Sequence, residues 1–177
     1  MKISLAGIWS FFILSLAHTL IPLDALAQEK VTLGWVEKVR IFPGDLVLHA
    51  KLDTGADYSS INASDMKKFV KNGKSFVSVS LRNRYGRMEE ITREVVRTAK
   101  IKREGTEEAT EREVIRLGVC LGGIFMEEQF NLANRSNFDY QVLIGRSFLT
   151  GNVIIDPSIT YTVEPNCENV QLEEVEK

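Results

Sequence analysis

Histidine and cysteine are scarce in this chain of 177 residues, which contains two of each. His18 lies in an N-terminal apolar run, so His49 is the only histidine in the rest of the sequence, and no His-Glu-x-x-His motif occurs. Because zinc sites need three or four closely arranged ligands, we expect no metal site. The phosphate-binding pattern Gly-x-x-x-x-Gly-Lys-Ser/Thr is also missing, so we expect no nucleotide or other cofactor.

Neither sign of charge dominates, since 22 basic and 24 acidic residues give a net charge of −2. This balance argues against nucleic-acid binding, which usually requires a clear basic excess. The charge is unevenly distributed, however. Residues 82–103 contain eight basic and three acidic side chains, a net +5 that leaves −7 for the rest. This segment could attract an acidic peptide, or it could simply pair with the protein's own acidic residues.

Long hydrophobic runs are absent beyond the N-terminus. There, Lys2 precedes an apolar stretch over residues 3–17, and Ala25-Leu26-Ala27 fits a small-x-small cleavage site. This pattern predicts a signal peptide over residues 1–27, and a membrane anchor is the alternative. Gln28 at the new N-terminus argues against a lipoprotein. We therefore expect a periplasmic or secreted product with no stable membrane anchor.

Export would bring Cys120 and Cys167 into an oxidising compartment, where a disulfide persists. The sequence cannot show whether the two side chains meet, so a disulfide and two separate thiols both stay open. Cleavage would leave about 150 residues, enough for one domain. We assign this domain to residues 28–164 and an acidic flexible tail to residues 165–177.

Short β-branched or alternating runs, separated by turn residues, predict a mostly β protein of the small sandwich or barrel type. The expected strands are Val31–Ile41, Asp45–Asp53, Phe76–Arg82, Ile91–Ile101, Glu113–Cys120, Glu128–Leu132, Gln141–Ile144 and Val153–Val163.

Helix is expected in two short places only. Residues 62–65 can cap a helix over Met66–Val70 that Asn72-Gly73 would end, and Arg146–Thr150 can form the second. Tyr85-Gly86 and Glu104-Gly105 are expected hairpin tips.

The most informative motif is Asp53-Thr54-Gly55-Ala56, which follows an apolar strand. Gly55 allows a tight turn and a close approach of substrate, and the Thr54 hydroxyl can brace the turn. Strand alternation places Lys51 on the same face as Asp53. Two such turns would bring together two carboxylates that share a proton, one acting as acid and one as base. Because the chain carries one copy, this chemistry implies a homodimer.

Residues 52–57, Leu-Asp-Thr-Gly-Ala-Asp, together with residues 143–149, Leu-Ile-Gly-Arg-Ser-Phe-Leu, resemble half of a retropepsin-type aspartic peptidase. The resemblance implies that Asp53 is catalytic and that Thr54 and Gly55 support it. It also implies that Asp57 forms a structural ion pair with a buried Arg146.

A closer resemblance covers residues 33–163. Its blocks are residues 34–37, 51–56, 112–115, 121–123, 132–135, 143–146 and 153–157. They are similar to a bacterial family commonly labelled ATP-dependent zinc proteases, some of which are encoded beside ATP-grasp glutamate ligases. The family implies a retropepsin-like closed barrel with one or two short helices and, for some members, trimming of ligase-added glutamates.

This chain departs from both patterns near the motif. Lys51 stands where retropepsins usually carry an apolar residue, and Asp57 stands where the bacterial family usually has another residue such as Arg. A cation beside Asp53 favours the ionised carboxylate, which suits a base or an anion-directed site better than an acid dyad.

We hypothesise an exported aspartic-type peptidase or peptide-trimming hydrolase that uses Asp53, supported by Lys51, Thr54 and Gly55. Its substrate would be a peptide or protein, with glutamate-rich peptides as the candidate class. Substrate contacts are assigned to Ala56, Arg84, Arg87 and Arg97. The main alternative is a binding module that captures a peptide without cutting it, and a zinc hydrolase is a distant third.

Overall fold

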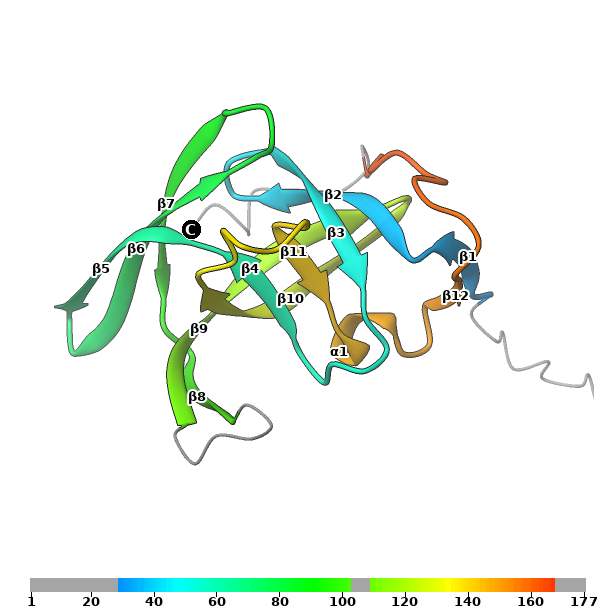
Figure 1. The fold of residues 1–177 in the computed structure, drawn as a ribbon. Coiled ribbons are helices and arrows are strands. Elements are labelled where there is room, and N and C mark those ends of the chain that lie inside the picture. Colours follow the sequence, from blue (N-terminus) through cyan, green and yellow to red (C-terminus); the bar gives the residue numbers. More distant parts are fainter. Residues whose placement is uncertain (1–28, 103–108, 168–177) are drawn as a thin grey trace, which may run out of the picture.

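We analysed a computed structural model, which describes residues 29–102 and 109–167 (Figure 1). The predicted signal peptide and the predicted hairpin tip at Glu104-Gly105 lie outside the described residues. No helix within these two ranges is long and apolar enough to cross a membrane.

The centre of the molecule is a closed six-stranded barrel. Going round the barrel, the strands are β10 (Ile124–Ala133), β4 (Ser59–Asn62), β11 (Val142–Ile144), β3 (Leu46–Leu52), β2 (Val36–Phe42) and β9 (Ala109–Leu121). Antiparallel pairing of β9 with β10 completes the circle. The predicted mostly β, retropepsin-like barrel is therefore confirmed.

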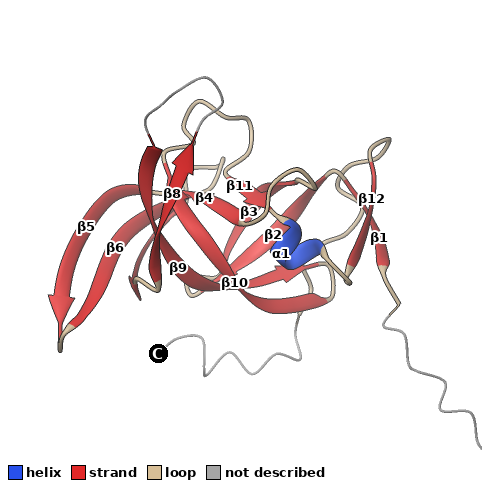
Figure 2. Cartoon of the chain, turned by 90° about the horizontal axis from the view of Figure 1, so that it is seen from below, coloured by secondary structure: helices blue, strands red, loops and turns tan. Residues whose placement is uncertain are grey.

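Two smaller sheets flank the barrel on opposite sides (Figures 1 and 2). On one side, β1 (Val31–Gly34) pairs in parallel with β12 (Val153–Asp156). On the other, β5 (Ser64–Lys71), β6 (Lys74–Arg82) and β7 (Met88–Glu94) form a three-stranded antiparallel sheet. Strand β8 (Arg97–Lys102) extends the barrel sheet by pairing with β9.

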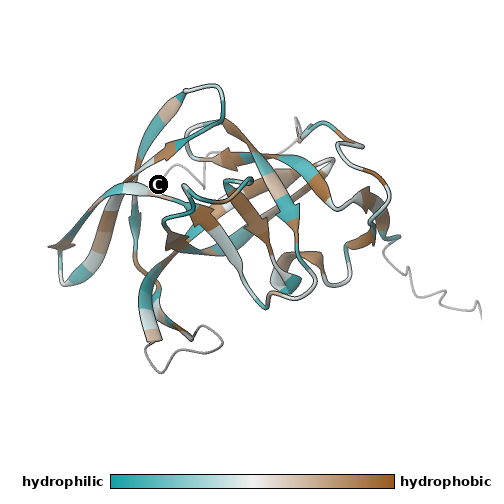
Figure 3. Cartoon of the chain, in the orientation of Figure 1, coloured by the Kyte–Doolittle hydropathy of each residue, from teal (hydrophilic) through white to brown (hydrophobic). Residues whose placement is uncertain are grey.

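The barrel interior is filled by one apolar cluster. Hydropathy alternates along the barrel strands (Figure 3), as expected when one face of each strand points inward. Leu48, Ile61, Leu121 and Phe130 are at most 1% exposed, and Phe148 from the helix packs against the same cluster. Burial of this apolar surface is the main favourable term holding the barrel together.

The helix predicted over Met66–Val70 is wrong, because this segment is strand β5, which pairs with β6. Asn72 and Gly73 both have positive φ, 52° and 76°, and form a two-residue loop between the paired residues Lys71 and Lys74. Asn-Gly with this geometry is the preferred tip of a β-hairpin, so it connects two strands here and does not end a helix.

The strand predicted over Val153–Val163 ends at Asp156, whereas other local predictions are confirmed. Helix α1 (Arg146–Leu149) forms where expected. Tyr85-Gly86 lies in the turn between β6 and β7, with Gly86 at φ 91°. The long prediction over Val31–Ile41 splits into β1 and β2 at Trp35, and Ile91–Ile101 splits into the end of β7 and β8.

The segment after β12 is fastened to the barrel at two points. Cys120 and Cys167 form a disulfide, which decides the alternative left open by the sequence. The tail predicted to begin at residue 165 is thus bound as far as Cys167, and residues 168–177 lie outside the described residues.

The second fastening is the fully buried carboxylate of Glu37 on β2. It accepts hydrogen bonds from the backbone N–H of Gly34 at 2.8 Å and of Thr162 at 2.9 Å, and from the Thr162 hydroxyl. A buried carboxylate needs such donors to offset the loss of water, so these contacts hold the chain ends of the domain together.

Candidate active site

The Asp53 turn begins directly after β3 and is held mainly by backbone hydrogen bonds. The Asp53 N–H donates to the Ile144 carbonyl at 2.8 Å, and the Ala56 N–H donates to the Asp53 carbonyl at 3.2 Å. The Gly55 N–H donates to Asp53 Oδ1 at 3.0 Å, which fixes the plane of the carboxylate. With its side chain 24% exposed, Asp53 is oriented by its own turn and still reachable by a ligand.

A second loop, at the junction of β11 and α1, locks this turn in place. The Arg146 N–H donates to the Ala56 carbonyl at 2.9 Å, and the Ser147 N–H donates to the Asp57 carbonyl at 3.0 Å. A Cβ on Gly145 would lie 2.6 Å from the Tyr58 carbonyl carbon, so only glycine allows this approach. The structure thus explains why the two motifs occur together although about 90 residues separate them.

Arg146 contacts Asp57 as the sequence predicted, and its Nη1 also donates to the Thr54 carbonyl at 2.7 Å. The expectation that this guanidinium is buried is wrong, since the side chains of Arg146 and Asp57 are 46% and 71% exposed. Asp57 lies in the turn after β3 and Arg146 is the first residue of α1, so both are outside the barrel strands, where water solvates the charges. Exposed ion pairs contribute only about 0–1 kcal/mol, so this pair ties two loops together more than it stabilises the core.

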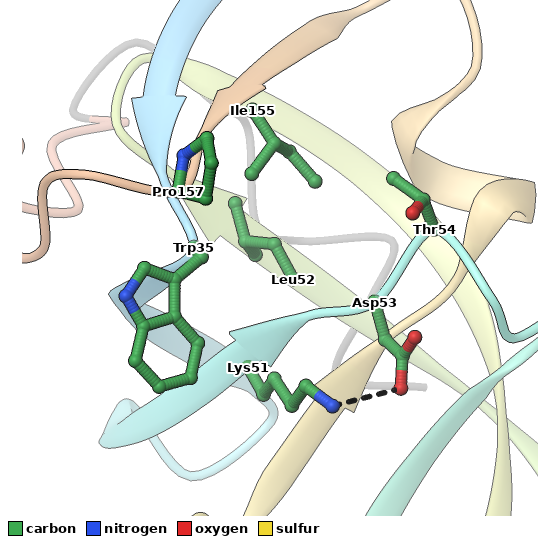
Figure 4. A pocket seen from close by; sticks show the side chains of 7 residues that line it. All are labelled: Trp35, Lys51, Leu52, Asp53, Thr54, Ile155 and Pro157. Atoms are coloured by element: carbon green, nitrogen blue, oxygen red, sulfur yellow. Dashed lines mark ion pairs between the residues drawn. The ribbon is translucent and has the colours of Figure 1, made fainter.

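Lys51 lies beside Asp53, with its Nζ 3.4 Å from Asp53 Oδ2 (Figure 4). The two side chains border a cavity of about 470 Å³ whose other lining residues are Trp35, Leu52, Thr54, Ile155 and Pro157. The cavity therefore combines an apolar wall with one carboxylate and one ammonium group. Sequence reasoning missed Trp35 and Pro157, which come from segments far from the motif and could be placed here only by the fold.

A second cavity, of about 270 Å³, lies on the other side of the turn. Ala56, Asp57 and Tyr58 form one wall. The remaining lining residues are Ser60, Arg97, Ala99, Ile101, Arg112, Asn131, Arg135 and Leu143. The structure therefore brings two of the predicted contact residues, Ala56 and Arg97, to one cavity.

Arg112 and Arg135 were missed as site residues. Both stand in sequence blocks of the family resemblance, but nothing in their spacing shows that they converge with Arg97. Burial lowers the pKa of Arg135, and the neighbouring charge of Arg112 lowers it further, whereas Asp53 acts to raise it. Arg135 therefore interacts electrostatically with both Arg112 and the Asp53 carboxylate.

Arg84 and Arg87 do not join this site. Arg87 pairs with Glu89 and donates from Nη2 to the Gly44 carbonyl at 3.1 Å, in the turn before β3, whereas Asp53 follows the end of β3. Arg84 Nη1 lies 3.4 Å from His49 Nδ1. The basic segment thus divides between two places on the molecule.

His49 is buried, and its Nδ1 lies 2.8 Å from the Tyr161 hydroxyl. Burial is the main cause that lowers its pKa, and Arg84 and Lys38 add to the effect. Among residues 29–102 and 109–167, no three His, Cys, Asp or Glu side chains gather closely enough to hold a metal ion.

Comparison with known proteins gives relatives of two kinds. Proteins of Shewanella pealeana and Shewanella halifaxensis, each named as a probable alpha-L-glutamate ligase, are 32% and 30% identical over 141 residues. These matches cover 77% of this chain and 30% of each relative, so the chain spans about a third of their length.

A crystal structure of a Legionella pneumophila protein, described as of unknown function, superposes with a TM-score of 0.67 at 30% identity. It covers 77% of this chain and 100% of the other. A family model described as "RimB-like: Retropepsin-like aspartic endopeptidase RimB" matches residues 32–166. With the retropepsin-like barrel and the clamped Asp-Thr-Gly turn, this match shows that the chain belongs to the RimB-like family of retropepsin-like aspartic endopeptidases.

Proposed function

We propose that this protein hydrolyses peptide bonds with Asp53, paired with Asp53 of a second copy. The observation that carries the proposal is the geometry of the turn: the Gly55 N–H orients the Asp53 carboxylate at the edge of a cavity that a peptide can enter. One carboxylate would take a proton from water, and the other, protonated, would donate to the carbonyl oxygen of the scissile bond.

A second copy is required because the mechanism needs two catalytic carboxylates and each chain has a single Asp-Thr-Gly turn. Asp57, the next acidic residue, is engaged by Arg146 and cannot serve as the partner acid in this arrangement. In the isolated chain the Lys51 ammonium group lies 3.4 Å from Asp53 Oδ2, so we infer that dimer formation or substrate binding displaces it from the carboxylate.

Acidic peptides are the proposed substrates. The ligase name of the relatives supports this choice, since proteins named for joining glutamate contain a segment similar to this chain. Cationic side chains beside the motif, Lys51 on one side and Arg97 on the other, would favour an anionic ligand.

We also propose that the protein acts after export. The N-terminal apolar run with its small-residue cleavage site supports this, and the Cys120–Cys167 disulfide is of the kind that persists in oxidising compartments.

The test is cleavage of glutamate-containing peptides by the purified mature protein, with products identified by mass spectrometry. Asp53→Asn should reduce the rate by about 10²-fold or more, because it removes a general acid and base. The matched control is Asp45→Asn, which alters an exposed carboxylate paired with Arg40 at the other end of β3. Equal loss of activity in both variants would contradict a specific role for Asp53.

Mixing tests the paired mechanism. Excess Asp53→Asn protein added to wild type should inhibit, because mixed dimers contain one competent carboxylate. Full activity in the mixture, with only monomers in analytical ultracentrifugation, would overturn the dyad and leave Lys51 as the partner of Asp53. If Asp53→Asn and wild type bind acidic peptides equally and neither cleaves them, the protein is a binding module.

A further inference from the structure

Three guanidinium groups from three different strands or loops line the cavity beside the Asp53 turn. Arg97 comes from the start of β8, Arg112 from β9 and Arg135 from the loop after β10. Their β-carbons are brought together by the pairing of β8 with β9 and of β9 with β10. Like charges repel, so a cluster of this kind is costly unless an anion offsets it.

Each guanidinium is anchored by a neutral oxygen. Arg97 Nε donates to Gln129 Oε1 at 3.0 Å, Arg112 Nη1 donates to Asn131 Oδ1 at 3.0 Å, and Arg135 Nε donates to the Tyr140 carbonyl at 3.2 Å. The Arg97 guanidinium also lies over the Tyr58 ring, 4.7 Å from its centroid. These contacts fix the orientation of the three groups through acceptors that carry no charge.

Within residues 29–102 and 109–167, Arg97 and Arg135 form no ion pair with an acidic side chain. Asp57 also lines the cavity, but its carboxylate is taken by Arg146. Arg135 is nine-tenths buried, where a charged group needs a partner most.

Ser60 gives independent support for a binding site here. It lines the same cavity, is 5% exposed, and its hydroxyl has no hydrogen-bond partner among the described residues. Asn131, in contrast, has a partner at each end of its amide, since its Nδ2 donates to the Ser59 carbonyl at 2.7 Å while its oxygen accepts from Arg112. Such a buried hydroxyl beside a cationic cluster can donate a hydrogen bond to an anionic ligand.

We propose that this cavity is a specificity subsite that takes one carboxylate of the peptide substrate, held by Arg97, Arg112 and Arg135 with Ser60 as an additional donor. The assignment rests on the proposed peptidase function and locates its acid recognition. The volume of about 270 Å³ fits a side chain or a chain end more than a whole ligand. Because Ala56, Asp57 and Tyr58 form one wall, the bound carboxylate belongs to a residue close to the cleaved bond.

The experiment measures binding by calorimetry in the Asp53→Asn background, so that it does not depend on catalysis. The probes are tetraglutamate, tetraglutamine and the C-terminally amidated form of each. Arg112→Gln should weaken binding of tetraglutamate by about 10- to 100-fold, the loss expected for charged hydrogen bonds. Arg87→Gln, which removes the same charge from the β6–β7 turn, should change it less than about twofold, as expected for screened surface charge.

The probes separate the two sources of a carboxylate. The subsite takes a glutamate side chain if two results are found together. Tetraglutamine and its amidated form should bind equally weakly, and amidation should leave the affinity for tetraglutamate unchanged. If amidation abolishes binding of both peptides, the subsite takes the chain terminus. Either result supports the subsite.

Equal weakening by Arg112→Gln and Arg87→Gln, or no weakening by either, would overturn it. Should Arg112→Gln fail to fold, Arg97→Lys retains charge but loses the planar guanidinium, and an unchanged affinity in that variant would also overturn the subsite. Failure of the peptidase proposal is distinguishable, because wild type would then bind tetraglutamate through the cluster without cleaving any peptide.

Discussion

Two charged regions of this molecule, one fully buried and one partly buried, differ in how their polar groups are satisfied. The Glu37 carboxylate, with no exposed surface, accepts hydrogen bonds from Gly34, Thr162 and the Thr162 hydroxyl. The arginine cavity instead is lined by three cations and by the Ser60 hydroxyl, which has no partner within residues 29–102 and 109–167.

This difference distinguishes a charged group that stabilises the fold from charged groups that can bind a ligand. Glu37 is complete within the folded chain, so its hydrogen bonds contribute to stability and leave nothing for a ligand. In the arginine cavity the Ser60 hydroxyl has no partner among the described residues, and such an unpaired buried group is costly unless it serves function. Burial of a charge therefore does not reveal its role, whereas the state of its hydrogen bonds does.

The strongest test of this comparison is Glu37→Ala. It removes the acceptor of the buried Gly34 N–H and of the partly buried Thr162 N–H, so we expect the free energy of unfolding to fall by about 3 kcal/mol or more. Urea denaturation measures the change. Glu164→Ala removes an exposed carboxylate that pairs with Lys38 and should cost less than about 1 kcal/mol. Similar losses in both variants would mean that the Glu37 contacts do not act as described.

A smaller effect of opposite sign is expected in the arginine cavity. Ser60→Ala removes a buried hydroxyl that has no partner, so the free energy of unfolding should rise by about 1 kcal/mol. The same variant should bind tetraglutamate more weakly, because the ligand loses a donor. If the variant is less stable than wild type and binds tetraglutamate with unchanged affinity, Ser60 stabilises the fold and does not contact the ligand.

The smallest effect concerns His49, a buried side chain whose neutral form is favoured by its surroundings. Its pKa is lowered by burial, then by Arg84 and Lys38. The unfolded chain therefore binds more protons than the folded chain, and stability is lost as pH falls below about 6.5 through the folded pKa. Melting temperature should drop on acidification from pH 7.5 to 5.5, and His49→Phe should flatten this dependence. An unchanged slope would show that other groups cause it.

The contrast between local and long-range information also explains the errors of sequence reasoning. The strands of the barrel follow from alternation and β-branched residues, and helix α1 was found because its motif is specific. The helix expected over Met66–Val70 failed because Asn72-Gly73 suits a hairpin tip as well as a helix end. Pairing of β5 with β6 decided between the two.

The sequence by itself determined that the chain folds as a retropepsin-like barrel, that Asp53 begins a tight turn, and that the Gly145-Arg146 loop meets it. These features depend on short motifs whose backbone geometry few residues can adopt, as with Gly145 against Tyr58. Only the tertiary structure decided the Cys120–Cys167 disulfide and the separation of Arg87 from Arg97. It alone brought Arg112 and Arg135 to one cavity, because strand pairing joins residues whose distance along the chain carries no signal.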